Sequence, residues 1–179
     1  MTNEAAAEEL TLAIVSRTGP RDPDFDRLMR AHERMVVNTA YRLLGRIEDA
    51  RDAAQEVFLR LLKNLDQIEG DPKPWLYRVT VNVCNDHYRR RLPVREPDAR
   101  RADPSPDASI ILELEDRKRL LMRGLETLAP RERTAIVLRD IEGLSTRETA
   151  AILGIEEVSV RSLISIARVK LAKFVRDNK

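Results

Sequence analysis

The sequence predicts an all-α protein, made of two small helical domains that a flexible proline-rich linker joins, with a helix-turn-helix in the second domain. Three observations support this fold class. Charged residues make up 35% of the chain and aromatic residues only 4%, a composition that favours helices over a sandwich or barrel. Apolar residues recur at spacings of three and four in several segments, as in amphipathic helices. Residues 92 to 109 hold four prolines and almost no large apolar side chain, which is typical of a linker.

The first domain is expected at residues 25 to 91, after an N-terminal extension or first helix at residues 1 to 24. An apolar stripe from Phe25 to Leu44 predicts a helix that ends at Gly45. A second helix is predicted from about Glu48 to Asn64. Prolines and a glycine then predict a loop, and a third helix begins near Trp75 and ends in the arginine run at 89 to 91.

The second domain is expected at residues 110 to 179. A helical stripe from Ile110 to Leu128 is closed by Pro130, and a helix from Arg131 to Ile141 is stopped by Gly143. The segment Ser145 to Glu148 matches a capping box, in which both side chains satisfy free backbone amides of a new helix. That helix ends at Leu153-Gly154, and a last helix runs from about Glu157 to Val175, which completes a helix-turn-helix.

The last helix has an apolar face and a polar, cationic face, as entry into a major groove requires. Lysines and arginines continue to the C-terminus and could neutralise several phosphates. The alternative is a solvated end of an amphipathic helix. The polar face carries Arg161, Ser162, Ser165 and Arg168.

The third helix combines aromatic rings with cations and an amide. Trp75 and Tyr77 lie next to Arg78, and Asn82 follows one turn later. The helix ends in three arginines. Unstacked bases need this combination, because rings stack on any base while amide and guanidinium groups discriminate among bases. The alternatives are that Trp75 is a core residue and that the arginines form a solvated helix end.

The second helix has polar residues beside its apolar stripe, namely Asp52, Gln55, Glu56 and, one turn later, Arg60. Such a face can dock a partner helix, although solvated surface is the default interpretation.

Other classes of function find little support. No catalytic motif is present, so an enzyme with a small-molecule substrate or a cofactor is not expected. Cys84 and His87 are spaced as a helical pair, but two histidines and one cysteine are too few for a zinc shell. The single cysteine fits a reducing compartment, and no segment reaches membrane-spanning length. We therefore expect a cytoplasmic protein without direct membrane insertion.

Taken in order, these motifs resemble a bacterial RNA polymerase sigma factor of the extracytoplasmic-function type, with only the family's regions two and four. The likeness covers roughly residues 25 to 91 and 110 to 176. Glu48 to Phe58 is similar to the family's polymerase-binding helix, and Trp75-Leu76-Tyr77-Arg78 with Asn82, Asp86 and Arg89 is similar to its promoter-melting helix. Four segments of the second domain are similar to the family's DNA-binding module: Leu128 to Arg133, Gly143-Leu144-Ser145, Glu148-Thr149-Ala150 and Leu153-Gly154.

The resemblance implies a protein that binds core RNA polymerase and directs promoter recognition, DNA melting and transcription initiation, without making or breaking a bond. It also implies double-stranded and melted promoter DNA as ligands and an inhibitory anti-sigma factor as a partner. The linker permits the two lobes to close together or to spread along a promoter.

The resemblance further implies three sets of site residues. The polymerase clamp would be bound by Asp52, Gln55, Glu56 and Phe58. The minus-ten element would be bound by Asn64 or Asp66 in a base-capturing loop, together with Trp75, Tyr77, Arg78, Asn82, Arg89, Arg90 and Arg91. The minus-thirty-five element would be bound by Arg147, Ser159, Arg161, Ser162, Ser165 and Arg168.

Two departures from the family's pattern keep alternatives open. Leu163 and Ile166 stand where basic residues are usual, which gives a less cationic groove face and suggests packing on a protein. The loop from Ile68 to Trp75 is shorter than is common in the family. The alternatives are a sigma mimic that engages an anti-sigma protein without recognising DNA, and an ordinary helix-turn-helix regulator.

Overall fold

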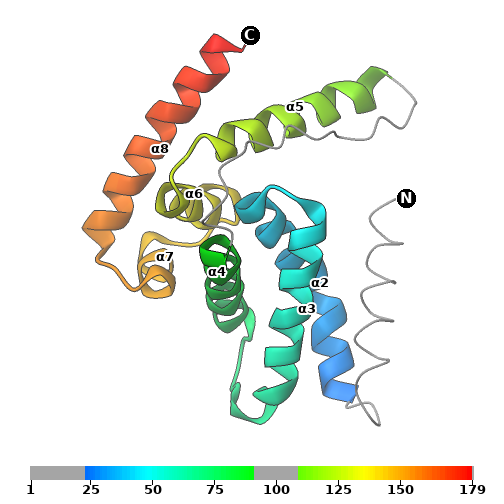
Figure 1. Cartoon of the computed structure of the whole chain (residues 1–179). Coiled ribbons are helices and arrows are strands. Elements are labelled where there is room, and N and C mark those ends of the chain that lie inside the picture. The colour runs from blue at the N-terminus through cyan, green and yellow to red at the C-terminus, as the bar shows by residue number, and fades with distance from the viewer. Residues whose placement is uncertain (1–22, 91–108, 179) are drawn as a thin grey trace.

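The computed structural model describes residues 23–90 and 109–178, and within this part of the chain every regular element is helical. The predicted all-α class is confirmed. The N-terminal extension, Arg91 and the linker up to residue 108 lie outside the described residues. In chain order the elements are α2 (Pro23–Leu44), α3 (Ile47–Lys63), a 3-10 turn η1 (Leu65–Gln67), α4 (Lys73–Arg90), α5 (Ser109–Glu126), α6 (Pro130–Ile136), a π-helical turn η2 (Val137–Ile141), α7 (Thr146–Leu153) and α8 (Glu157–Asp177) (Figure 1).

The first lobe is built from α2, α3 and α4, which pack on one another. Gly45 ends α2 with a φ of +81°, a left-handed conformation that glycine adopts without strain. The helix α4 begins two residues earlier than the sequence predicts, at Lys73, whose backbone N–H donates to Asp71 Oδ1 at 3.0 Å. Pro74 therefore lies in the first turn of α4 and not in the preceding loop, because a helix leaves its first N–H groups without partners and a proline fits there.

The second lobe contains the predicted helix-turn-helix, formed by α7 and α8. The capping box is confirmed, since Ser145 Oγ accepts from Glu148 N at 3.1 Å and Glu148 Oε2 accepts from Ser145 N at 2.7 Å. These hydrogen bonds lower the pKa of the Glu148 carboxyl. Gly154 ends α7 with a φ of +63°. The turn and both helix boundaries thus follow from local sequence.

The helix predicted from Arg131 to Ile141 is instead two elements. The regular helix α6 stops at Ile136, and η2 follows with the wider hydrogen bonding of a π-helix. The backbone N–H of Glu142 donates to Val137 O at 2.9 Å and closes this turn. A π-turn adds a residue to a helical turn and redirects the side chains that come after it.

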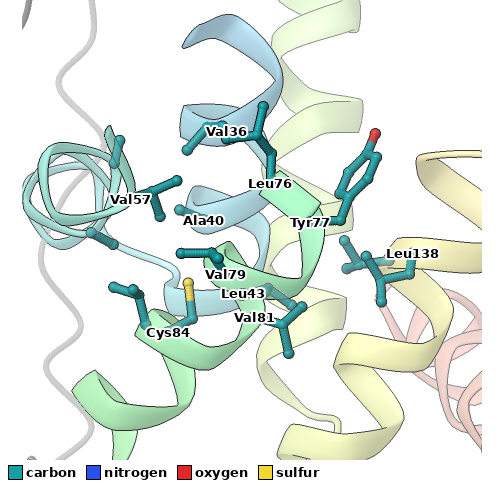
Figure 2. Packing of buried hydrophobic residues seen from close by; sticks show 14 of the residues in the cluster. Val36, Ala40, Leu43, Val57, Leu76, Tyr77, Val79, Val81, Cys84 and Leu138 are labelled. Atoms are coloured by element: carbon teal, nitrogen blue, oxygen red, sulfur yellow. The ribbon is translucent and has the colours of Figure 1, made fainter. Parts of the chain in front are cut away.

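The two predicted helical lobes share one continuous apolar core. Val81 of α4 and Leu138 of η2 are both buried in the same cluster (Figure 2). A smaller cluster lies beneath the helix-turn-helix and contains Ala135, Ala150, Val160 and Ile164. The lobes are therefore closed on each other. No helix in the described ranges is long and apolar enough to cross a membrane.

Candidate functional site

The outer face of α3 carries the residues predicted to bind polymerase. Asp52 is exposed, and Gln55 and Glu56 are half-buried beside it. Glu56 pairs with Arg60 one turn later. Phe58 is fully buried, so it anchors α3 on the core and supports this face from beneath.

The loop after α3 holds the two candidates for base capture. The Asn64 side-chain amide donates to Arg60 O at 2.7 Å, which satisfies a carbonyl in the last turn of α3. Asp66 lies in η1 with its side chain exposed. Asn64 therefore has a capping role, and Asp66 is the candidate that faces solvent.

The helix α4 presents an exposed row of polar and cationic side chains: Arg78, Asn82, Arg89 and Arg90. Trp75 is half-buried against the core, as the alternative interpretation of this residue expected. Tyr77 differs from the sequence prediction of an open stacking surface, because only 8% of it is exposed. Its hydroxyl donates to Glu142 Oε2 at 3.1 Å, and burial together with this carboxylate raises the pKa of Tyr77 far above its usual value.

The predicted groove face of α8 is exposed at Ser159, Arg161, Ser162 and Ser165, and Arg147 is exposed on α7. Arg161 forms an ion pair with Glu157 at 3.1 Å. Arg168 is held differently, because its guanidinium donates two hydrogen bonds to Asp140, at 2.8 and 2.9 Å. This bidentate pair raises the pKa of Arg168 and fixes its guanidinium against Asp140.

The two unusual apolar residues of α8 have different surroundings. Leu163 is half-buried and packs against the small cluster beneath the helix-turn-helix, so its role is structural. Ile166 is 47% exposed, and Val158 and Val169 are more exposed still, at 63% and 69%. The outer face of α8 is therefore partly apolar.

Sequence reasoning missed a polar cluster between the lobes. The carboxylate of Glu142 accepts hydrogen bonds from Thr39, Arg42 and Tyr77, all in the first lobe. One signal was present: Glu142 directly follows a helical turn, where the negative end of the helix dipole disfavours a carboxylate. A glutamate at such a position suggests a partner elsewhere, but the sequence does not say which.

Cys84 is a buried core residue. Only 3% of it is exposed, and burial raises the pKa of its thiol to about 12. Among the described residues, no group of three or more histidine, cysteine, aspartate or glutamate side chains could hold a metal ion.

Comparison with known proteins decides the family. Residues 28–92 match Sigma-70 region 2, and residues 118–171 match Sigma-70 region 4. The chain is similar to the ECF RNA polymerase sigma factor SigE of Mycolicibacterium smegmatis, with 35% identity over 185 residues that cover 96% of this chain and 70% of SigE. The chain belongs to the extracytoplasmic-function sigma factors.

Two further similarities agree with this assignment. The sigma factor SigW of Bacillus subtilis is 30% identical over 170 residues, which cover 86% of this chain and 89% of SigW. The fold is that of the sigma factor RpoE of Bartonella quintana, solved with the anti-sigma factor NepR, with a TM-score of 0.72 at 22% identity over 88% of this chain and all of RpoE. The chain is thus a sigma factor that directs transcription initiation.

Proposed function

We propose that this sigma factor binds core RNA polymerase through the outer face of α3. Asp52, Gln55 and Glu56 supply the contacts, and Phe58 holds the helix in place from below. The observation that carries the proposal is the arrangement of the first lobe, in which this polar face and the cationic row of α4 belong to adjacent packed helices. One small lobe can therefore hold polymerase and opened DNA together.

Promoter DNA is assigned to two surfaces. The row from Arg78 to Arg90 on α4, with Asp66 in the preceding loop, takes the melted minus-ten strand. The exposed face of α8, with Arg147, takes the minus-thirty-five duplex. Unpairing costs a few kcal/mol per base, and base capture and phosphate contacts offset this cost. The sigma factor itself makes and breaks no bond in this scheme, and it acts in the cytoplasm.

An anti-sigma factor is the expected inhibitory partner. The solved structure of RpoE from Bartonella quintana contains such a partner, NepR. Extending this class of partner to the present chain rests on family membership.

The proposal is tested by two variants that serve as controls for each other. Gln55→Ala on α3 should weaken binding to core polymerase, measured by gel filtration or fluorescence anisotropy, and leave minus-thirty-five contacts unchanged. Arg161→Ala on α8 should leave polymerase binding intact and reduce protection of the minus-thirty-five element. The division of roles would be contradicted if neither variant weakened its interaction, or if one variant weakened both polymerase binding and protection of the minus-thirty-five element.

The exposed apolar residues of α8 favour one second candidate, a sigma mimic whose recognition helix binds a protein. Val158, Ile166 and Val169 would then form the contact surface. A mimic needs no phosphate contacts, so its function would not depend on salt. The mimic is excluded if the complex of sigma factor and polymerase loses promoter affinity steeply as salt rises. The loss of affinity should then be steeper for the wild type than for Arg161→Ala.

A further inference from the structure

A carboxylate of the second lobe is enclosed by three donors of the first. Only 11% of the Glu142 side chain is exposed. Its Oε1 accepts from Thr39 Oγ1 at 3.0 Å and from the Arg42 guanidinium, and its Oε2 accepts from Tyr77 Oη at 3.1 Å. Hydrogen bonds to a charged group are stronger than neutral ones, so this cluster favours closed lobes.

A second polar contact joins the same two lobes. Arg133, which is 4% exposed, donates from Nη1 to Leu43 O at 2.8 Å. Leu43 belongs to the last turn of α2, whose carbonyls lack partners within the helix. The Arg133 guanidinium also lies 5.9 Å from the ring centre of Tyr88 on α4. Both contacts exist only while the lobes are together.

The closed arrangement brings the two proposed DNA surfaces side by side. The helix α7 packs against both α4 and α8, so a single helix, roughly 10 Å thick, lies between the recognition helix and the promoter-melting helix (Figure 1). The minus-ten and minus-thirty-five elements are about 25 base pairs apart, which is about 85 Å of B-form DNA. The closed protein cannot contact both elements at once.

Closure also covers part of the promoter-melting helix. The Tyr77 ring is buried, and its hydroxyl is bound to Glu142. Lys73 and Arg78 line a cavity of about 450 Å³ that faces Glu148 and other residues of α7. In contrast, Asp52 on α3 and Arg161 on α8 stay exposed. Closure therefore hides Tyr77, one of the residues predicted to bind melted DNA, whereas Arg78, Asn82 and Arg89 on the same helix stay exposed.

We propose that Glu142 is a latch that holds the free sigma factor in an autoinhibited closed state. Opening breaks its hydrogen bonds to Thr39, Arg42 and Tyr77, frees Tyr77 and separates the lobes. The predicted linker of residues 92 to 109 could then span up to about 60 Å. This inference rests on the proposed assignment of α4 to melted DNA.

The test compares Glu142→Gln and Thr39→Val with Asp177→Asn in the full chain. Glu142→Gln keeps the shape, removes the charge and places an amide donor among donors. Thr39→Val removes one hydroxyl at nearly constant volume and lies in none of the proposed binding surfaces. Asp177→Asn is the control, because Asp177 is exposed at the end of α8 and its loss changes the net charge by the same amount.

The first measurement is the distance between spin labels at Lys63→Cys and Lys173→Cys, two exposed positions on different lobes. Glu142→Gln should raise the ratio of open to closed molecules about tenfold or more, the effect of losing one hydrogen bond to a charged group. Thr39→Val should raise it a few-fold, and Asp177→Asn should leave it unchanged. Far-UV circular dichroism checks that each variant is folded, and if Glu142→Gln unfolds, Thr39→Val decides the result. Distance distributions that match the wild type would overturn the latch.

The second measurement is the rate of promoter opening with core polymerase, read by permanganate reactivity of unpaired thymines. Glu142→Gln should open the promoter faster than wild type, in proportion to its open fraction. A variant that is open but opens promoters no faster overturns the autoinhibition and leaves the proposed function standing. If the wild type binds no polymerase, the proposed function fails, while the distances in the free protein still decide the latch.

Discussion

At the residue scale, two neighbouring ionisable side chains on α2 respond to pH in opposite directions. His32 is 9% exposed, and burial, helped by the charge of Lys73 and opposed by Asp71, lowers its pKa. Glu33 is 8% exposed, and burial raises its pKa. Each shift disfavours the charged form in the folded state, so each predicts a specific dependence of stability on pH.

His32 makes the fold sensitive to acid. Because its folded pKa lies below its unfolded value near 6.5, the unfolded chain binds the proton more tightly, and stability falls as pH drops below about 6.5. His32→Gln should reduce the loss of stability between pH 6.5 and 5, measured by urea unfolding. His87→Gln on α4 is the control, being the other histidine of the chain. Equal acid sensitivity in wild type and His32→Gln would refute this role.

The raised pKa of Glu33 has the opposite effect on stability, which it lowers at neutral pH and not in acid. Its Oε1 is buried without a hydrogen-bond partner in the described structure, so the ionised form is costly at neutral pH. Glu33→Gln should raise the free energy of unfolding at pH 7 by on the order of 1 kcal/mol. The gain should decline as pH falls through the raised pKa of Glu33 and vanish below 4.5, where the wild-type carboxyl is neutral in both the folded and the unfolded state. Glu48→Gln, at an exposed position of α3, should show no such gain, and a destabilised Glu33→Gln at pH 7 would contradict the prediction.

At the element scale, the turn of the helix-turn-helix depends on one backbone conformation. Gly154 has a φ of +63°, and a side chain there would meet no neighbour within 4 Å, so conformation alone limits substitution. Gly154→Ala should cost about 1 kcal/mol of stability, because an L-residue is strained in the left-handed region. Gly154→Asn should cost clearly less, since asparagine tolerates that region. Thermal unfolding measures both, and equal costs would show that strain is not the cause.

Elements set by local chemistry could be predicted from the sequence, and those set by distant contacts could not. The cap at Ser145 and the glycine stops involve residues within one turn of each other, so their pattern is legible in the chain. The π-turn at Val137–Ile141 leaves no comparable local signal. It places Glu142 between the lobes, and its partners are 65 to 103 residues away in sequence. The burial of Tyr77 could not be predicted for the same reason, because its partner Glu142 lies 65 residues further along the chain.

At the scale of the whole molecule, the two helical lobes agree with the fold class predicted from the sequence, but the proline-rich segment between them does not indicate whether the lobes are apart. Amphipathic stripes show that a face is buried without showing what buries it. In the structure, Val81 of the first lobe and Leu138 of the second are buried in the same apolar cluster, so the two lobes share one core. The face of α3 that we propose for polymerase binding and the outer face of α8 remain outside this core. On the proposed assignments, the closed molecule leaves the polymerase-binding residues of α3 accessible, buries Tyr77 and holds the two DNA surfaces too close together to reach both promoter elements.

As a sigma factor, this chain gives core RNA polymerase its promoter specificity. The most direct measurement is run-off transcription from the genomic DNA of its source bacterium, with core polymerase in the presence and absence of the purified protein. We expect discrete new transcripts whose start sites share one pair of upstream elements, and we expect these transcripts to be lost with Gln55→Ala. Core polymerase that forms no complex with the protein and gains no new start site would contradict it.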